Sequence, residues 1–541
     1  MKIIPFHQIP GMPPLVVDML DGNAGIEPGF SLTVDAATWR ERSAKEASLG
    51  RTSKLTEHIL SRAKGLDLHE SARRNIEALS EPGTLTVVTG QQVGLAGGPL
   101  LTLYKALTTI YLARSLQKES GVRTVPVFWM ATSDHNLPEA AQLRWIDKNN
   151  KLSGISRPSD DNRSPVGNIM LGDQATELIE KLEIELPDSE FKPEFMEMLR
   201  ASYRPDETFG RAFHHLGNLI LGPLGMVMLD PEDPDLKKSC QPFWERAVGD
   251  IEGRMDRLLQ RSTEIQSAGY EVQAPVSSGR PALFVLESGI RRKVVLEGRA
   301  KRAQSDLIIS VSDLMEIAKN EPERFSVGVT LRPLYQGYLL PVGAYVAGPH
   351  EVAYWAQLSD VFEPLQIPKP ALIHRATMTL LEKKTKRRLS KLNILPEAFF
   401  SNLNELTDTI LIEHSDNRNA ELFLELRRQA GTCSEKLFER ASGPYAGLDT
   451  IIDNAFKKIN YQLDKLENTF NQRLRQQHSQ IMDTVEVVSH HLRPAGQLQE
   501  RVINPFYYYS RYGSRILEIL LKKVRHYSEG HIIIDLEEEL E

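Results

Sequence analysis

The sequence predicts an α/β protein with a ligand crevice, followed by a C-terminal helical hairpin. Residues 85–89 and 124–131 are apolar, β-branched runs typical of buried strands, and a helical apolar period over 100–116 separates them. Short apolar runs recur at 225–229 and 342–347, each beside a helical segment, which favours a doubly wound sheet. In the last third of the chain, apolar residues instead repeat every three or four positions, as in packed helices.

Composition narrows the class of protein. The 541 residues are 41% hydrophobic and 25% charged, which is ordinary for a soluble globular chain of several domains. A net charge of −7 argues against a dedicated nucleic-acid-binding or membrane-surface protein. The two cysteines, Cys240 and Cys433, exclude a disulfide scaffold. Since neither a secretory signal nor a transmembrane run is recognisable, we expect a cytoplasmic protein with no nucleic-acid or membrane partner.

The first polar loop follows the strand at 85–89 and reads GQQVGLAGG. Gly90, Gln91, Gln92 and Gly94 lie where a strand leads into a helix, and backbone N–H groups at such a point favour a phosphate or carboxylate. The loop matches neither of the standard nucleotide-binding fingerprints. A turn whose glycines serve only backbone geometry explains the motif equally well. The tandem glutamines favour ligand binding slightly, because paired amides in a tight loop add little to packing.

The second polar loop, TSDHN, follows the strand at 124–131. Asp134 would orient His135 and raise its basicity, which suits a general base acting on an amine, with Glu139 nearby. Hydrogen bonding at a helix cap is the alternative. Metal ligation needs more convergent ligands than the sequence places here, and the adjacent histidine pairs at 214–215 and 490–491 point apart on a helix. The sequence therefore predicts no metal site.

A third polar group comprises Arg332, Gly348, Glu351, Tyr354 and Trp355, around the end of the strand at 342–347. Arg332 would clamp a carboxylate with two hydrogen bonds, although a structural ion pair is equally consistent with the pattern.

Further basic and aromatic residues lie towards the C-terminus. Asn504, Tyr508 and Arg511, together with Arg501, offer stacking and anion binding, whereas packing is the alternative. The basic segment at 381–392 is interpreted as a solvated helix face, with anion binding as the alternative.

Two runs of apolar residues predict an antiparallel helical hairpin with a turn at Gly443, Pro444 and Gly447. In this pattern Cys433 is a small buried hydrophobe. The runs consist of Phe423, Leu426, Ala430, Cys433 and Leu437, and of Ile452, Phe456, Ile459, Leu463, Leu466 and Phe470. Apolar residues outside these runs, at Phe438, Tyr461 and Leu474, predict a homodimer joined through about 417–485. A monomer whose hairpin folds onto its own core is the alternative.

Four segments together carry a resemblance to a known family. They read VVTGQQVGLAGGPLLTLYK, VPVFWMATSDHNLPE, TLRPLYQGYLLPVGAYVAGPHEVAYWAQL and QERVINPFYYYSRYG. In these segments, and in their order along nearly the whole chain, the protein resembles the BshC family, the cysteine ligases of bacillithiol biosynthesis. One position departs from the family pattern, because Asn136 stands where an acidic residue is expected. That departure weakens any role that needs a carboxylate there.

The resemblance implies a Rossmann-like core with two connecting-peptide insertions and a dimerising C-terminal coiled-coil domain. It places the core in three parts, at 1–150 with the N-terminal segment, at 206–265 and at 327–376. The insertions would be 151–205 and 266–326. The coiled-coil hairpin would be 377–490, and 491–541 would pack back on the core.

The resemblance also implies that the protein joins cysteine to the amine of glucosaminyl-malate, the last step to bacillithiol. Amide formation needs an activated carboxyl group, so ATP or another nucleotide is expected from the chemistry, although no motif shows it. Gln91, Gln92 and Gly94 would cradle substrate or phosphate, His135 would deprotonate the attacking amine, and Arg332 would hold a carboxylate. The alternatives are an adenylyl or aminoacyl transferase acting on another amine, and a non-catalytic scaffold of the thiol pathway.

Overall fold

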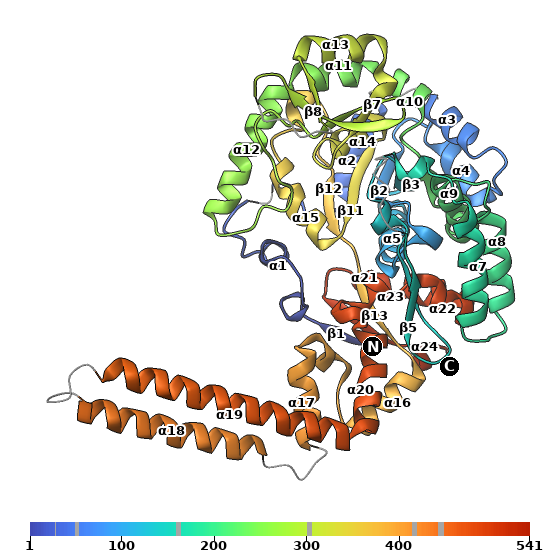
Figure 1. Ribbon diagram of the computed structural model, residues 1–541. Coiled ribbons are helices and arrows are strands. Elements are labelled where there is room, and N and C mark those ends of the chain that lie inside the picture. The colour runs from blue at the N-terminus through green and yellow to red at the C-terminus, as the bar shows by residue number, and fades with distance from the viewer. Residues whose placement is uncertain are drawn as a thin grey trace. The chain divides into compact units, whose positions relative to one another are not determined.

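The computed structural model describes residues 1–540 apart from 28, 49–53, 158–163, 300–305, 414–418 and 442–447. The chain divides into two compact units (Figure 1). The first comprises Met1–Leu380 and Gln497–Glu541, and the second comprises Leu381–Gly496.

The first unit is built on a five-stranded parallel sheet with the order β12-β11-β2-β3-β6. Its strands are β2 (Leu85–Gln92), β3 (Thr124–Ala131), β6 (Val227–Leu229), β11 (Val342–Ala347) and β12 (Ala371–His374). The first four confirm the strands predicted from sequence, whereas β12 was not predicted. Along the chain, β3 and β6 are added on one side of β2, and β11 and β12 on the other. The strand order therefore reverses between β2 and β11, the position where open α/β sheets bind ligands.

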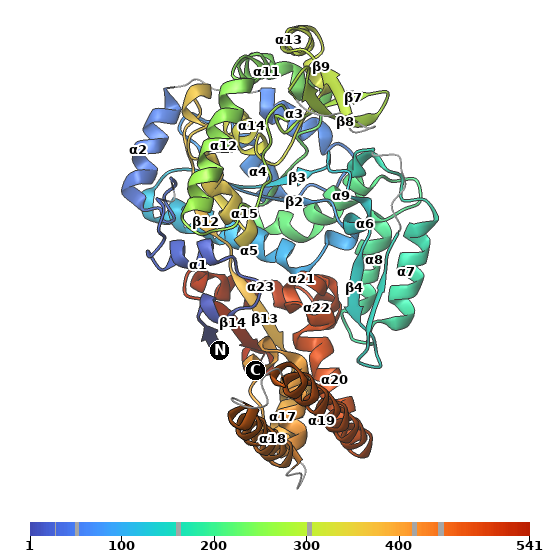
Figure 2. The same cartoon turned by 60° about the vertical axis from the view of Figure 1, so that its left-hand side comes forward.

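Helices cover both faces of this sheet (Figures 1 and 2). On one face, α5 (Leu100–Ser120) and α9 (Phe209–Leu221) pack against side chains such as Phe128 and Met130. On the other face, α4 (Glu70–Ala78), α14 (Arg332–Leu339) and α15 (Pro349–Trp355) pack around Val127 and Trp129. Because both faces are buried, the strands read as continuous apolar runs rather than as alternating ones.

Smaller elements surround the core of the first unit. Two helices, α7 (Asp173–Glu185) and α8 (Lys192–Ser202), are separated by a segment that contains Pro187. These follow a hairpin of β4 (Leu143–Ile146) and β5 (Leu152–Ile155). A four-stranded sheet has the order β10-β7-β8-β9, from β7 (Leu283–Glu287), β8 (Ile290–Leu296), β9 (Asp306–Ile309) and β10 (Phe325–Val327). A third sheet joins β1 (Lys2–Ile4), β14 (His531–Asp535) and β13 (Thr377–Leu381).

The second unit contains the predicted helical hairpin, formed by α18 (Asn419–Ala441) and α19 (Asp449–Gln477), which lie side by side in both views (Figures 1 and 2). Phe423 packs edge-on against Phe470 with their ring centroids 5.7 Å apart, and Arg427 bonds Asp464 at 2.8 Å. The predicted turn at 443–447 lies outside the described residues. Cys433 is exposed, so the prediction that it is buried was wrong.

The predicted apolar runs lie only partly between these two helices. Leu437, Ile459, Leu466 and Phe470 keep 42–48% of their surface exposed. The physical reason is that two helices can shield only one stripe of each other, while these side chains extend around that stripe. Within the parts of the chain described above, no helix combines the length and the apolar character needed to cross a membrane.

Three buried histidines should make folding stability depend on pH. Burial lowers the pKa of His214 and His531 to about 4 and that of His374 to about 3. The unfolded chain binds protons at these residues below about pH 6.5, whereas the folded chain stays neutral there. Stability should therefore fall as pH drops from about 6.5 to about 4, by about 1.4 kcal/mol per pH unit for each histidine. Denaturant unfolding at several pH values measures this slope.

The variant His374→Phe isolates one of these protons, because it removes a single buried imidazole that packs edge-on against Phe6. We expect the variant to reduce the pH dependence of the free energy of unfolding by the contribution of one histidine. The exposed control His7→Phe should leave this slope unchanged. An unaltered slope in His374→Phe would contradict the assignment of His374 as buried and neutral.

Candidate active site

A cavity of about 570 Å³ opens where the strand order reverses, at the carboxyl ends of β2 and β11. It is also bounded by β7 and β8 of the four-stranded sheet and by the first turns of α14 and α15. All of its lining residues belong to the first unit. Ten residues singled out from the sequence line it, namely Gly90, Gln91, Gln92, Asp134, Glu139, Arg332, Gly348, Glu351, Tyr354 and Arg501.

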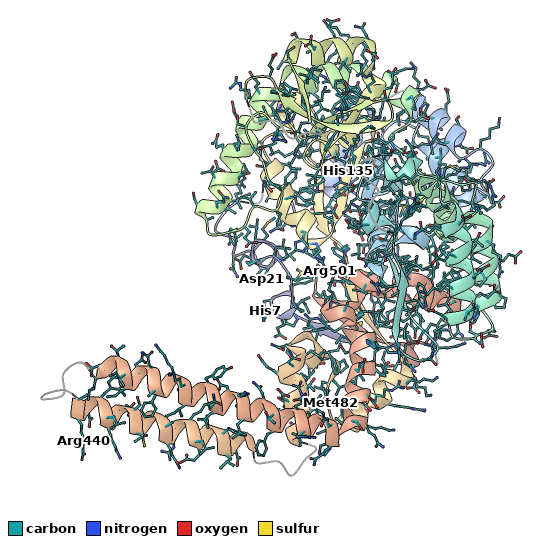
Figure 3. All side chains as sticks on the ribbon, in the orientation of Figure 1. His7, Asp21, His135, Arg440, Met482 and Arg501 are labelled. Carbon is teal, nitrogen blue, oxygen red and sulfur yellow. The ribbon has the colours of Figure 1, made fainter. Side chains whose placement is uncertain are left out.

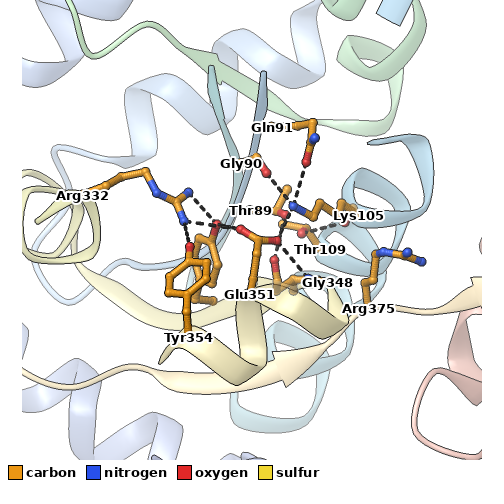
Figure 4. A network of polar contacts seen from close by, with 12 residues as sticks. Thr89, Gly90, Gln91, Lys105, Thr109, Arg332, Gly348, Glu351, Tyr354 and Arg375 are labelled. Atoms are coloured by element: carbon orange, nitrogen blue, oxygen red, sulfur yellow. Dashed lines mark hydrogen bonds and ion pairs between the residues drawn. The ribbon is translucent and has the colours of Figure 1, made fainter. Parts of the chain in front are cut away.

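Glu351 lies at the centre of a polar network in this cavity (Figure 4). It stands in the first turn of α15, where one carboxylate oxygen accepts the backbone N–H of Gly348 at 2.9 Å and forms an ion pair with Lys105. The other oxygen accepts bonds from the Tyr345 hydroxyl at 3.0 Å and from Arg332 Nη2 at 3.3 Å. Every acceptor direction of the carboxylate therefore faces a donor, two of which are cationic.

Lys105 reaches this network from α5, which packs beneath β2. Its side chain is buried, and Nζ donates to the carbonyl of Gly90 at 2.8 Å and to Gln91 Oε1 at 2.9 Å. The ammonium thus fixes both the end of β2 and the side chain of Gln91. Lys105 stands among apolar residues in the first three turns of α5, and this sequence signal was missed.

The electrostatic balance favours the charged forms of Glu351 and Arg332. Burial would raise the pKa of Glu351, but Lys105 and Arg332 lower it below its usual value. Burial lowers the pKa of Lys105, against the opposing effect of Glu351. Burial would likewise lower the pKa of Arg332, but Tyr345, Tyr354 and Glu351 outweigh it and the net shift is upward. One carboxylate is thus held between two cations, which leaves a positive excess.

Arg332, at the start of α14, is positioned by aromatic hydroxyls. Its Nη1 donates to the Tyr345 hydroxyl at 2.7 Å, and its Nη2 donates to the Tyr354 hydroxyl. Trp355 fixes the Tyr345 ring, because it is buried and stacks on that ring with 4.7 Å between the centroids. The guanidinium passes over Gly90, where an added Cβ would lie 3.0 Å from Nη1 and 3.1 Å from the carbonyl oxygen of Trp129.

Gly90→Ala should therefore impair the site by displacing Arg332. The carbonyl of Trp129 belongs to β3, which is paired on both sides within the sheet and has little freedom to move, so the guanidinium must shift instead. We expect a loss of activity of about tenfold or more, with a stability cost of about 1–3 kcal/mol for overpacking. Steady-state kinetics and denaturant unfolding measure the two effects. The control is Gly431→Ala, whose added Cβ meets open space. Gly121→Ala is unsuitable, because the backbone of Gly121 has a φ of +75°. Full activity in Gly90→Ala would refute the close approach.

Arg375 and Arg501 add two further cations. Arg501 belongs to the basic and aromatic group singled out from the sequence, whereas Arg375 was not predicted. Arg375 follows β12 and is buried, and its Nη1 and Nη2 bond the two oxygens of Glu500 at 3.0 and 2.6 Å. Glu500 and Arg501 lie on the short helix α21 (Gln499–Val502). Both arginines line the cavity.

The lining as a whole is electropositive. Seven cationic side chains face the three carboxylates of Asp134, Glu139 and Glu351. Asp306 and Glu500, outside the lining, pair with Arg280 and Arg375, and an excess of positive charge remains. The arrangement favours an anionic ligand. The seven cations are Lys105, Arg280, Arg291, Lys293, Arg332, Arg375 and Arg501.

His135, labelled in Figure 3, is not among the residues that line the cavity, although its neighbour Asp134 is. Its Nδ1 lies 3.9 Å from Asp134 Oδ1 and 3.3 Å from Nη1 of Arg291, a residue of β8. Asp134 does line the cavity, where its carboxylate accepts bonds from the Gln92 amide and, at 3.1 Å, from the backbone N–H of Asn136.

The remaining predicted residues lie outside the cavity lining. Gly94 belongs to the glycine loop, whose N–H groups at Gly94, Gly97 and Gly98 donate to carbonyls within the same loop. Gly97 and Gly98 need glycine there, because their φ values are +82° and +74°. Asn504 donates to the carbonyls of Ala96 and Gly98 at 2.9 and 2.6 Å and so holds the loop closed.

Tyr508 and Arg511 also have identifiable partners outside the lining. Tyr508 is buried and packs edge-on against Tyr507, whose hydroxyl accepts a bond from Arg511 Nη1 at 2.6 Å. Across the described ranges, no group of three or more His, Cys, Asp or Glu side chains is placed to hold a metal ion.

Comparison with known proteins gives matches along nearly the whole chain. The family model for the N-terminal Rossmann-like domain of Bacillithiol biosynthesis BshC matches residues 1–376, and the one for its C-terminal coiled-coil domain matches 378–536. A relative from Salinibacter ruber is 31% identical over 506 residues and covers 92% of each chain. One from Bacillus anthracis is 27% identical over 529 residues, 96% of this chain and 98% of its own. Both bear the name "Putative cysteine ligase BshC".

Likeness to solved structures is much weaker. A tryptophanyl-tRNA synthetase of Plasmodium falciparum aligns with 88% of this chain and 97% of its own at 11% identity, with a TM-score of 0.21. A likeness of that size bears on neither fold nor function.

Proposed function

This chain belongs to the BshC family of bacillithiol biosynthesis, and we propose on that basis that it is a cytoplasmic ligase which joins L-cysteine to the amine of glucosaminyl-malate. The names of its relatives support a ligase that acts on cysteine. The observation in this molecule that best supports the proposal is the cationic cavity where the strand order reverses. Glucosaminyl-malate is an anion, since its malate moiety carries carboxylate groups, and the cavity offers an excess of cations to such a ligand.

The side chains of the cavity suit the separate tasks of amide formation. Arg332 has the planar fork that binds a carboxylate with two hydrogen bonds, and its aromatic partners hold it in place. Lys105 stabilises negative charge that develops near Gly90 and Gln91. We assign removal of a proton from the attacking amine to the pair Asp134 and His135 at the end of β3.

The reaction needs a co-substrate that activates the carboxyl group of cysteine, and we propose ATP or another nucleoside triphosphate. The phosphate groups of such a co-substrate are anionic, so the same excess of cations would serve them. Cleavage to AMP and pyrophosphate would indicate an acyl adenylate, whereas ADP and phosphate would indicate an acyl phosphate.

Reconstitution with purified protein tests this function. Cysteine, glucosaminyl-malate and each nucleoside triphosphate in turn are incubated with the protein, and mass spectrometry follows both the thiol product and the nucleotide. We expect a product whose mass is the sum of the two substrates less one water, formed only when all three are present. A product that forms equally well without cysteine, or none with any nucleotide, would refute the proposed ligation.

We also propose that the protein is a homodimer joined through the hairpin of α18 and α19. Leu437, Ile459, Tyr461 and Leu466 remain 42–64% exposed on this hairpin, and exposed apolar groups of this size favour a partner surface. A two-fold axis lets one patch serve both chains. Light scattering should give twice the 61.0 kDa mass of the chain.

Point variants within α19 locate the interface. We expect Tyr461→Glu combined with Leu466→Glu to yield a monomer, because both side chains would carry charge into the shared surface. Asn460→Glu is the control on the same helix, since Asn460 is exposed and points away from the face that carries Tyr461. A dimer that survives the double change would place the interface elsewhere, and a monomeric wild-type protein would refute the dimer.

A further inference from the structure

Arg375 carries a hydrogen-bond donor that the protein does not use. Its Nη1 donates to the carbonyl of Ala376 at 2.8 Å as well as to Glu500, and its Nη2 donates to Glu500. Nε is buried, and within the described part of the chain it has no hydrogen-bond partner. The side chain is only 2% exposed. A buried, charged donor without an acceptor is costly, so this N–H calls for an explanation.

The space beside Nε belongs to the cavity and is kept open by a glycine. A Cβ built on Gly348 would lie 3.6 Å from Arg375 Nε, 3.6 Å from Oε2 of Glu351, which is paired with Lys105, and 3.7 Å from Lys105 Cε. Gly348 has φ −77°, which any residue adopts, so the backbone does not require glycine there. The missing side chain instead leaves room in front of two cations. Arg375 and Gly348 both line the cavity.

Arg501 contributes a second cation to the same wall. It follows Glu500 directly on α21 and lines the cavity with Arg375. Burial, and then the nearby charge of Arg375, lower the pKa of Arg501, which is the effect of two like charges close together. Both carboxylate oxygens of Glu500 already accept hydrogen bonds, from Arg375, from the Thr377 hydroxyl and from the backbone N–H of Met378. A bound anion would relieve the repulsion between the two arginines.

We propose that Arg375 Nε and Arg501, in the space beside Gly348, form a second oxyanion-binding position in the cavity, separate from the fork of Arg332. Its ligand is an oxyanion, either a carboxylate of the acceptor substrate or a phosphate of the co-substrate. The inference rests on the proposed function in that it divides the same cavity between two anionic groups. A ligase that must hold a carboxylate-bearing acceptor beside a nucleotide needs such a division.

Equilibrium binding without turnover tests the proposal. L-malate is the probe for a carboxylate ligand and inorganic phosphate is the probe for a phosphate ligand, each titrated into the full-length protein by calorimetry. Arg501→Met removes one cation, and Gly348→Ala fills the space in front of Nε with a single methyl group. Arg515→Met, an exposed arginine of α23 (Arg515–Lys523), is the matched control.

We expect both site variants to weaken one probe by about 10- to 100-fold and the control to weaken neither. Selective loss of malate binding identifies a carboxylate ligand, and selective loss of phosphate binding identifies a phosphate ligand. Unchanged affinities in both folded variants, or no binding of either probe to the wild type, would overturn the proposal. Since no amide bond is formed in this experiment, failure of ligation and failure of the binding position are told apart.

Discussion

Replacing Lys105 by methionine is expected to lower the rate of ligation at least about 100-fold, the typical loss when one preorganised charge is removed from an active site. Methionine fills the path of the aliphatic stem but cannot donate to Gly90 and Gln91 or pair with Glu351. Glu351 keeps its bonds from Arg332, Tyr345 and Gly348, so we expect the protein to remain folded. Single-turnover kinetics with saturating substrates measures the effect on the chemical step.

The control lies on the same helix. Lys118→Met makes the same change at an exposed position of α5 and should leave the rate unchanged. If Lys105→Met were as active as Lys118→Met while circular dichroism showed both folded, the network around Glu351 would have a structural role only.

Replacing Glu500 by leucine is expected to cost about 3–5 kcal/mol in the free energy of unfolding, the range for breaking a buried ion pair. Both members of the pair are only 2% exposed. The change leaves the guanidinium of Arg375 without its counter-ion, and it removes the acceptor for the backbone N–H of Met378 and one partner of the Thr377 hydroxyl. Urea unfolding followed by tryptophan fluorescence measures the loss.

Two comparisons identify the cause of that loss. Glu252→Leu breaks an exposed ion pair with Arg299 and should change stability by less than about 1 kcal/mol. Arg375→Met combined with Glu500→Leu removes both charges and should recover much of the loss, because an apolar pair leaves no buried charge. If Glu500→Leu unfolded at the same urea concentration as Glu252→Leu, the pair would not be buried as described.

The sheet was largely predictable because its strands are buried on both faces. Runs such as 124–131 and 342–347 are almost entirely apolar and coincide with β3 and β11. The strand β2 extends three residues beyond the predicted one, since Gly90, Gln91 and Gln92 pair with Trp129, Met130 and Ala131. Glycine and glutamine are poor strand formers in isolation, and only the neighbouring strand keeps them extended.

The cavity was predictable only in part, because its members come from distant segments. The polar residues that follow predicted strands, such as Gln91, Asp134 and Glu351, were found from their position in the pattern. Lys105 and Arg375 were not, since a buried cation depends on partners that sequence spacing does not reveal. The same limit explains the glycine loop, where Asn504 closes a turn that lies about 400 residues away in sequence.

The position of bound glucosaminyl-malate tests the central claim most directly. A crystal structure of the protein soaked with this compound should show it in the cavity between β2 and β11, with one carboxylate on the guanidinium of Arg332 and its amine towards Asp134. An ordered molecule bound elsewhere, with the cavity around Glu351 containing only water, would contradict the account.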